Sequence, residues 1–191
     1  MHSLIIVAHP NKQSFSHIVA KTYAWNKNNI RIVDLYDHRY RQDFLQLDEN
    51  NRPADDHIRV VHQDLIRRSD EIVLCFPLWR FDAPAILKNR FDVNFSSGFA
   101  YKYRPGRFFP EKLLHHKHVR IFCTTWGSCR FYNTLGWFLI VLPRRLGRIH
   151  YVGLRMKSWT RFCDMGKYRT SDSRIWMVQK VQKIAQSALS S

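Results

Sequence analysis

Short apolar runs alternate along this chain with longer segments in which apolar residues recur every three or four positions. Residues 4–8 and 71–76 are almost continuously apolar, which is typical of strands covered on both faces of a sheet. Residues 117–125 predict a strand of the same kind. Residues 30–35 alternate and predict a further strand, and the weaker alternation over residues 150–159 predicts the last one.

The segments between these runs have the spacing of amphipathic helices. Ser14 is placed to cap a helix whose apolar positions include Phe15, Ile18 and Val19. Pro84 stands in the first turn of another helix, where its missing N–H is no loss. The expected further helices cover residues 57–68, 84–95, 133–146 and 173–189, and we expect irregular loops at 36–56 and 99–110.

Strands that alternate with helices predict an α/β fold, with a parallel sheet and right-handed crossovers. The 191 residues are enough for one domain with a sizeable core, and we expect a single domain over residues 1–191. The chain shows no internal repeat and no low-complexity segment.

Composition narrows the class of protein. Apolar residues make up 45% and aromatic residues 14%, which argues against disorder. The net charge of +16 raises nucleic acid or an anionic membrane as partners. The positive residues are scattered, however, and no nucleic-acid-binding motif is present. We therefore expect a solvated basic surface that attracts anionic ligands, and no nucleic-acid partner.

The cysteines and the apolar runs indicate a cytoplasmic protein. Cys75 and Cys123 fall in predicted strands, and the four cysteines lack the spacing of a zinc site. His115 and His116 have no acidic or cysteine partner at metal-ligand spacing, so no metal is expected. Residues 1–9 predict a strand rather than a secretion signal, and the longest apolar run, residues 135–142, is too short to span a bilayer.

Three loops hold the candidate chemistry. The segment from His9 to Ser16 leads from the first strand into the first helix, whose free N–H groups suit a phosphate; the alternative is an ordinary helix cap. No GxGxxG fingerprint is present. Trp79 and Phe81 follow the third strand, where flat apolar side chains suit a planar ring system. The Thr124–Thr125 pair begins a third loop after the fourth strand.

These residues also show a family resemblance. The stretch FPLWRFDAPAILKNRFDVNFSSGFAY, together with His9-Pro10, Ser14-Phe15 and Thr124-Thr125-x-Gly127, resembles the flavodoxin-like NAD(P)H:quinone oxidoreductases. That family includes DT-diaphorase and the ancillary oxidoreductases of glutathione-gated potassium efflux systems. The matches occur in the family's order and span most of the chain.

The resemblance implies a flavodoxin-like sheet of order 2-1-3-4-5, a bound FMN or alternatively FAD, and NAD(P)H as co-substrate. It implies two-electron, ping-pong reduction of quinones or similar acceptors by a homodimer. Tyr132 would assist hydride transfer, and Phe99 and Tyr101 would line the substrate pocket of the partner subunit. The implied cofactor-binding residues are His9, Gln13, Ser14, Phe15, Ser16, Pro77, Leu78, Trp79, Arg80, Phe81, Thr124, Thr125, Trp126 and Gly127.

Three positions depart from the family pattern. Arg80 stands where an aromatic residue is usual, Trp126 replaces a glycine, and Phe138 replaces a histidine that cooperates with the tyrosine. A bulky residue limits positive φ, so the loop at Trp126 is expected to differ. A second function from the same resemblance is that of an ancillary subunit of a potassium efflux transporter, for which the basic surface would suit an acidic or membrane-proximal partner.

Overall fold

The computed structural model describes residues 1–49, 57–130, 134, 149–166 and 170–188. Its central sheet is parallel and has the order β2-β1-β3-β6-β7. The strands are β1 (Ser3–Val7), β2 (Ile30–Asp34), β3 (Glu71–Pro77), β6 (His118–Thr124) and β7 (Arg155–Phe162). Since β4 and β5 lie outside this sheet, the order equals 2-1-3-4-5, which confirms the predicted flavodoxin-like fold.

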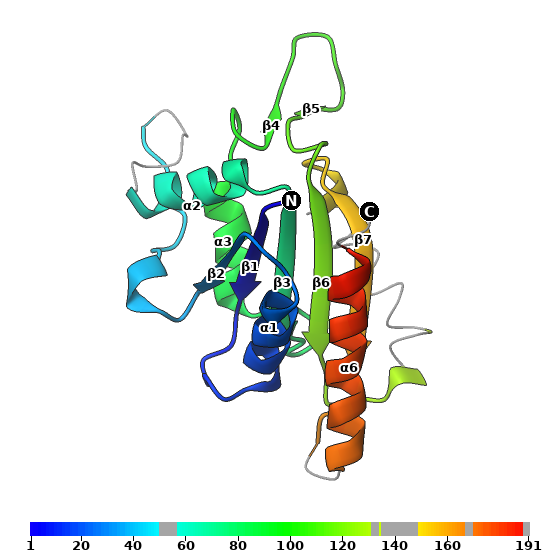
Figure 1. Cartoon of the computed structure of the whole chain (residues 1–191). Coiled ribbons are helices and arrows are strands. Elements are labelled where there is room, and N and C mark those ends of the chain that lie inside the picture. Colours follow the sequence, from blue (N-terminus) through cyan, green and yellow to red (C-terminus); the bar gives the residue numbers. More distant parts are fainter. Residues whose placement is uncertain (50–56, 131–133, 135–148, 167–169, 189–191) are drawn as a thin grey trace.

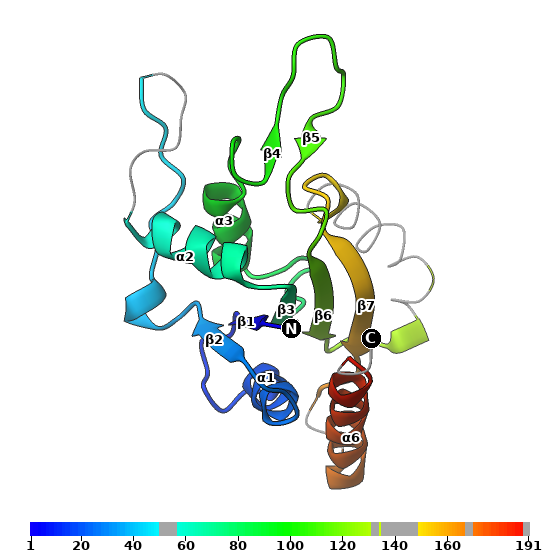
Figure 2. The same ribbon diagram turned by 45° about the horizontal axis from the view of Figure 1, so that its top comes forward.

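Helices cover both faces of the sheet. α1 (Phe15–Trp25) and α6 (Ser171–Ser187) lie side by side on one face, and α2 (His57–Arg68) and α3 (Ala85–Asn94) lie on the other (Figures 1 and 2). None of the helices in the described part of the chain is both long and apolar enough to cross a membrane.

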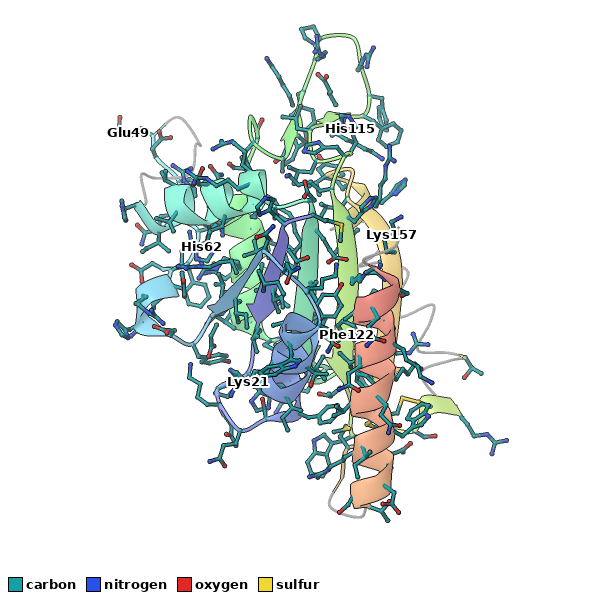
Figure 3. The ribbon with its side chains drawn as sticks, viewed as in Figure 1. Lys21, Glu49, His62, His115, Phe122 and Lys157 are labelled. Carbon is teal, nitrogen blue, oxygen red and sulfur yellow. A yellow bond between two sulfur atoms is a disulfide. The ribbon has the colours of Figure 1, made fainter. Side chains whose placement is uncertain are left out.

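The two-residue period of the strands explains this layering. On β1, Leu4 and Ile6 pack into the core beneath α2 and α3, whereas Ile5 and Val7 pack beneath α1 and α6. Phe122 of β6 belongs to the core beneath α1 and α6, and Figure 3 shows it beside α6. Because both faces are covered, the inner strands read as continuous apolar runs rather than alternating ones.

Three expectations from the sequence need correction. The last strand covers Arg155–Phe162 rather than residues 150–159, because the chain turns at Gly153, where φ is +93° and an added Cβ would lie 2.8 Å from the Cβ of Lys112.

The segment predicted as a loop at 99–110 contains β4 (Tyr101–Lys102), which pairs antiparallel with β5 (Glu111–Lys112). The expected irregular region 36–56 contains a 3₁₀ helix, η1 (His38–Tyr40). The helix predicted at 133–146 lies outside the described residues, except Thr134.

A buried carboxylate joins the strands at the amino edge of the sheet. Glu71, at the start of β3, is 1% exposed. Its Oε2 accepts hydrogen bonds from Ser3 Oγ, Tyr23 OH and Lys27 Nζ at 2.8–2.9 Å, and its Oε1 accepts one from Arg120 Nε at 2.7 Å. Burial would raise the pKa of Glu71, but these hydrogen bonds outweigh burial and lower it. The network ties β1, β3, β6 and α1 together.

Candidate functional site

Three of the loops singled out from the sequence meet at the carboxyl edge of the sheet. They follow β1, β3 and β6, which are neighbours in the sheet. Pro77 is paired with Thr124, and the N–H of Leu78 donates to the carbonyl oxygen of Thr124 at 2.7 Å. The rings of His9 and Trp79 lie edge to face with centroids 5.8 Å apart. This edge is where open α/β sheets bind ligands.

The N-terminus of α1 has free hydrogen-bond donors. Ser14 occupies the cap position, but its hydroxyl does not cap the helix and instead lies 3.0 Å from Nδ1 of His17. The N–H groups of Phe15 and Ser16 have no acceptor among the described residues. The hydroxyl of Ser16 is buried and likewise has no partner there. An unpaired buried hydroxyl is unfavourable by about 1–3 kcal/mol, so this turn offers an opening for an acceptor such as a phosphate oxygen.

The charges around this turn are already balanced by Asp34, the last residue of β2. Lys12 Nζ forms an ion pair with Asp34 Oδ2, and His17 Nε2 lies 2.9 Å from the same oxygen. Burial would raise the pKa of Asp34, but the hydrogen bonds from Lys12 and His17 outweigh it and lower the pKa. Burial and the nearby His17 lower the pKa of His9. Lys12 is therefore engaged by Asp34, and the neutral form of His9 is favoured, so the attraction for an anion at this turn comes mainly from the helix N-terminus.

The loop after β3 contains a strained turn. Arg80 and Phe81 have φ of 49° and 64°, although neither is glycine. The N–H and C=O groups of Trp79 and Asp82 exchange hydrogen bonds at 2.8 and 2.9 Å across this turn. Consecutive left-handed residues are rare outside glycine, asparagine and aspartate. Backbone strain of this kind occurs most often at binding and active sites. The turn leaves Trp79 and Phe81 41% and 53% exposed.

The loop after β6 is fixed by β7. Thr125 is buried, its N–H donates to the carbonyl oxygen of Phe162, and its Oγ1 accepts from the N–H of Gly127 at 3.2 Å. Trp126 is not among the non-glycine residues with positive φ, so its side chain causes no backbone strain. The loop therefore accommodates a tryptophan where the family pattern has glycine, and the ring of Trp126 is 74% exposed.

Two sets of predicted residues are not part of this edge. Phe99 and Tyr101 lie at the opposite, amino edge: Tyr101 pairs with Lys112, just before β6 begins, and the guanidinium group of Arg67 lies over the ring of Phe99. Figure 3 marks this region by His115, which lies near the top of the view, whereas the strands run downwards to their carboxyl ends. Tyr132, the predicted catalytic residue, and Phe138 lie outside the described residues.

Sequence reasoning missed two features of this edge. His17 and Asp34 hold the first turn of α1, and the signal for His17 was its place three residues after Ser14, one helical turn on. Cys129 and Cys163 form a disulfide across 34 residues of sequence. Two cysteines this far apart in the sequence form no local motif, so the sequence did not indicate that they pair.

The arrangement fits an elongated ligand with an anionic end and a flat ring. N–H groups and a hydroxyl without a partner in the described part of the chain suit the anionic end, and exposed aromatic rings beside them suit the ring. Within the described ranges, no group of three or more histidine, cysteine, aspartate or glutamate side chains is arranged to hold a metal ion.

Curated relatives match between half and four fifths of this chain. A Haemophilus influenzae protein named as an uncharacterized NAD(P)H oxidoreductase is 34% identical over 145 residues, which is 71% of this chain and 70% of that protein. The NAD(P)H dehydrogenase [quinone] 1 of Cavia porcellus is 28% identical over 181 residues, covering 81% of this chain and 65% of the enzyme. The glutathione-regulated potassium-efflux ancillary protein KefG of Cronobacter sakazakii is 35% identical over 98 residues, 51% of this chain and 46% of that protein.

Solved structures show the same fold. An NAD(P)H:quinone oxidoreductase from Methanothermobacter marburgensis superposes with a TM-score of 0.77 at 22% identity, over 98% of this chain and 96% of that one. General stress protein 14 of Treponema denticola, solved in complex with FMN, superposes with a TM-score of 0.70 at 20% identity, over 100% and 98% of the two chains. The family profile described as a flavodoxin-like fold matches residues 1–170. The chain therefore belongs to the flavodoxin-like family that includes the NAD(P)H oxidoreductases and quinone reductases.

Proposed function

We propose that this protein is a flavin-dependent NAD(P)H oxidoreductase that reduces quinones or similar two-electron acceptors by a ping-pong reaction. The observation that supports it most directly is the N-terminus of α1, which has no side-chain cap, beside the strained aromatic turn after β3. The buried hydroxyl of Ser16 in this turn has no partner among the residues that the structure describes. A helix N-terminus recognises phosphate, and exposed rings next to it recognise a flat heterocycle. The family membership supports the same function.

The proposed roles follow from the positions of the residues. Ser14, Ser16 and the first N–H groups of α1 would hold the phosphate, with His9, Gln13 and Phe15 completing that loop. Pro77, Leu78, Trp79, Arg80 and Phe81 would lie along the ring on one side, and Thr124, Thr125, Trp126 and Gly127 along its edge. When bound, the flavin supplies the hydride chemistry, and the protein binds and orients the reactants. Tyr132 is proposed to assist hydride transfer.

FMN is the proposed cofactor, with FAD as the alternative. The sequence shows no added segment for an adenine, and the Treponema denticola protein of the same fold was solved with FMN. NADH or NADPH would serve as the co-substrate. We place the enzyme in the cytoplasm, because these co-substrates are regenerated there.

A homodimer with shared sites is part of the proposal. Phe99 and Tyr101 lie at the amino edge of the sheet, away from the proposed flavin site of the same chain. They can line a substrate pocket only if a second copy brings its own amino-edge segment to that site. Closed two-fold pairing places two such sites in one dimer.

The absorbance spectrum of the purified protein tests the main proposal. After FMN is added and the excess removed, flavin bands should remain, bleach with NAD(P)H and return when a quinone is added. Buffer without protein, carried through the same desalting step, controls for free flavin. A protein that retains neither FMN nor FAD would refute the proposed function and leave the transporter subunit as the better hypothesis.

Subunit complementation tests the shared site. Ser14→Glu should block phosphate binding by charge repulsion, and Phe99→Ala with Tyr101→Ala should remove the substrate wall. Each homodimer should be inactive. Two differently tagged chains, co-expressed and purified as the heterodimer, should recover about half of the wild-type activity, because one of two sites is intact. An inactive heterodimer that still binds FMN would place the wall in the chain that holds the flavin.

The alternative function is that of an ancillary subunit of a potassium efflux transporter. It is supported by the 35% identity to KefG over about half of this chain. The net charge of +16 would suit an acidic or membrane-proximal partner. Co-purification with the transporter would support this function, and it is compatible with the enzymatic one.

A further inference from the structure

A disulfide closes the loop that follows β6. Cys129 lies two residues beyond Gly127, and Cys163 follows the last residue of β7. Their Cα atoms are 5.3 Å apart. Cys129 is half-buried, whereas Cys163 is 1% exposed. An attacking group from solvent would therefore reach the sulfur of Cys129 first.

The same two segments are joined by backbone hydrogen bonds. The N–H of Thr125 donates to the carbonyl oxygen of Phe162, and the N–H of Met165 donates back to that of Thr125, at 2.9 and 3.0 Å. The N–H of Asp164 donates to the carbonyl oxygen of Gly127 at 3.2 Å. The disulfide thus completes one cross-linked unit, made of residues 125–129 and 162–165. This unit contains Thr125, Trp126 and Gly127, which are proposed to lie along the edge of the flavin ring.

Backbone strain lies next to the cross-link. Asp164 has φ of 55°, although it is not glycine, and it directly follows Cys163. Aspartate adopts this conformation more readily than most residues, but it still costs free energy compared with glycine, so the surroundings help to hold it. The disulfide on one side and the hydrogen bond to Gly127 on the other supply that restraint. Opening the disulfide removes the covalent part of that restraint, so the segment is expected to relax.

The other two cysteines are sealed in the sheet. Cys75 and Cys123 are both 0% exposed and carry free thiols. Burial raises the pKa of the Cys75 thiol far above its usual range, so the reactive thiolate is scarce. A small thiol from solvent would therefore react at the Cys129–Cys163 pair and leave the core cysteines unchanged.

We propose that Cys129–Cys163 is a thiol–disulfide exchange site for small thiols. We further propose that its redox state sets the geometry of residues 125–129, the loop proposed to lie along the edge of the flavin ring. The second part rests on the flavin function proposed above. In a reducing compartment, where we place the enzyme, a disulfide is usually transient, catalytic or redox-sensing rather than structural. Its position beside Thr125 and Gly127 makes the loop the element that it controls.

The exchange is balanced in electrons and protons. A thiolate attacks Sγ of Cys129, the S–S bond breaks, and Cys163 leaves as a thiolate that takes up a proton. A second thiolate attacks the small-thiol sulfur of the mixed disulfide and releases Cys129 as a thiolate, which is also protonated. Two small thiols are oxidised to their disulfide, and the protein disulfide is reduced to two thiols.

The experiment compares the oxidised and the reduced protein, using dithiothreitol and reduced glutathione as the thiols. Alkylation with mass spectrometry should locate new thiols at Cys129 and Cys163 and none at Cys75 or Cys123. Hydrogen exchange should speed up in peptides covering residues 125–129 and 162–165. FMN binding should weaken by about tenfold, a change of about 1.4 kcal/mol.

A double variant separates the disulfide from general effects of reductant. Cys129→Ser with Cys163→Ser should resemble the reduced wild type and should not respond to thiols, while Cys75→Ser should respond as the wild type does. Circular dichroism confirms that each variant is folded. Resistance of the folded protein to millimolar glutathione would overturn the exchange site. Reduction that changes neither hydrogen exchange nor FMN affinity would overturn the control of the loop.

The two proposals fail in distinguishable ways. If neither redox form binds FMN or FAD, the proposed flavin function is refuted. Alkylation and hydrogen exchange then still decide whether the pair exchanges and whether the loop responds, because neither readout needs the cofactor.

Discussion

Glu71→Ala should lower the free energy of unfolding by about 3–5 kcal/mol, the usual effect of removing one partner from a buried ion pair. The substitution leaves the ammonium group of Lys27, which is 1% exposed, and the guanidinium group of Arg120 without their carboxylate. It also leaves the hydroxyl groups of Ser3 and Tyr23 without an acceptor. Urea denaturation at neutral pH, followed by circular dichroism, measures the change.

A surface ion pair provides the matched control. Asp64 and Arg68 are one turn apart on α2, with side chains 40% and 78% exposed, and Arg68 Nε lies 2.8 Å from Asp64 Oδ2. Asp64→Asn should therefore change stability by no more than about 0.5 kcal/mol. A Glu71→Ala variant that loses less than about 1 kcal/mol would show that the network is not a major source of stability. Adding Lys27→Met should recover part of the loss, because it removes one stranded charge.

The network also predicts how stability depends on pH. The pKa of Glu71 is lowered in the folded state, because its hydrogen bonds outweigh burial. Its contribution is therefore fully present above the unfolded pKa of about 4.3 and is lost as the pH falls through the folded-state pKa. The wild type should lose stability over this acid range more steeply than Glu71→Gln does.

Ser16→Ala should stabilise the cofactor-free protein and weaken FMN binding in the same variant. Without a ligand, the Ser16 hydroxyl is buried and unpaired among the described residues, so its removal should add about 1 kcal/mol of stability. With FMN, the variant lacks one hydrogen bond to a charged phosphate, which is worth about 1.5–3 kcal/mol. That difference corresponds to at least about tenfold weaker binding. Fluorescence titration with FMN and thermal unfolding of the apoprotein measure the two effects.

Riboflavin distinguishes the phosphate contact from other causes. It has the same ring as FMN but no phosphate, so Ser16→Ala should bind it as well as the wild type does. Equal weakening for riboflavin and FMN would mean that the substitution distorts the loop rather than removing a phosphate contact. Unchanged FMN affinity would place the phosphate away from the N-terminus of α1 and remove the main support for the proposed cofactor site.

The periodicity of the sequence determined most of the fold. Continuous apolar runs gave β1, β3 and β6, because a strand covered on both faces has no polar side, and α2 begins and ends where the pattern predicted. The last strand was misplaced because it has a neighbour on one side only, so its burial varies and its pattern is weak. The pair β4–β5 was missed because two-residue strands have no period to detect.

Periodicity put each of the three candidate loops next to a predicted strand, but the strand order that makes those strands neighbours came only from the family resemblance. Contacts between distant residues could not be found in this way. The His17–Asp34 pair joins α1 to β2, the Cys129–Cys163 bridge joins the segments after β6 and β7, and Glu71 accepts hydrogen bonds from residues of β1, α1 and β6. The left-handed turn at Arg80 and Phe81 was also hidden, because neither residue favours positive φ. Periodicity reports which face of an element is buried, whereas only the tertiary structure decides which side chains meet there.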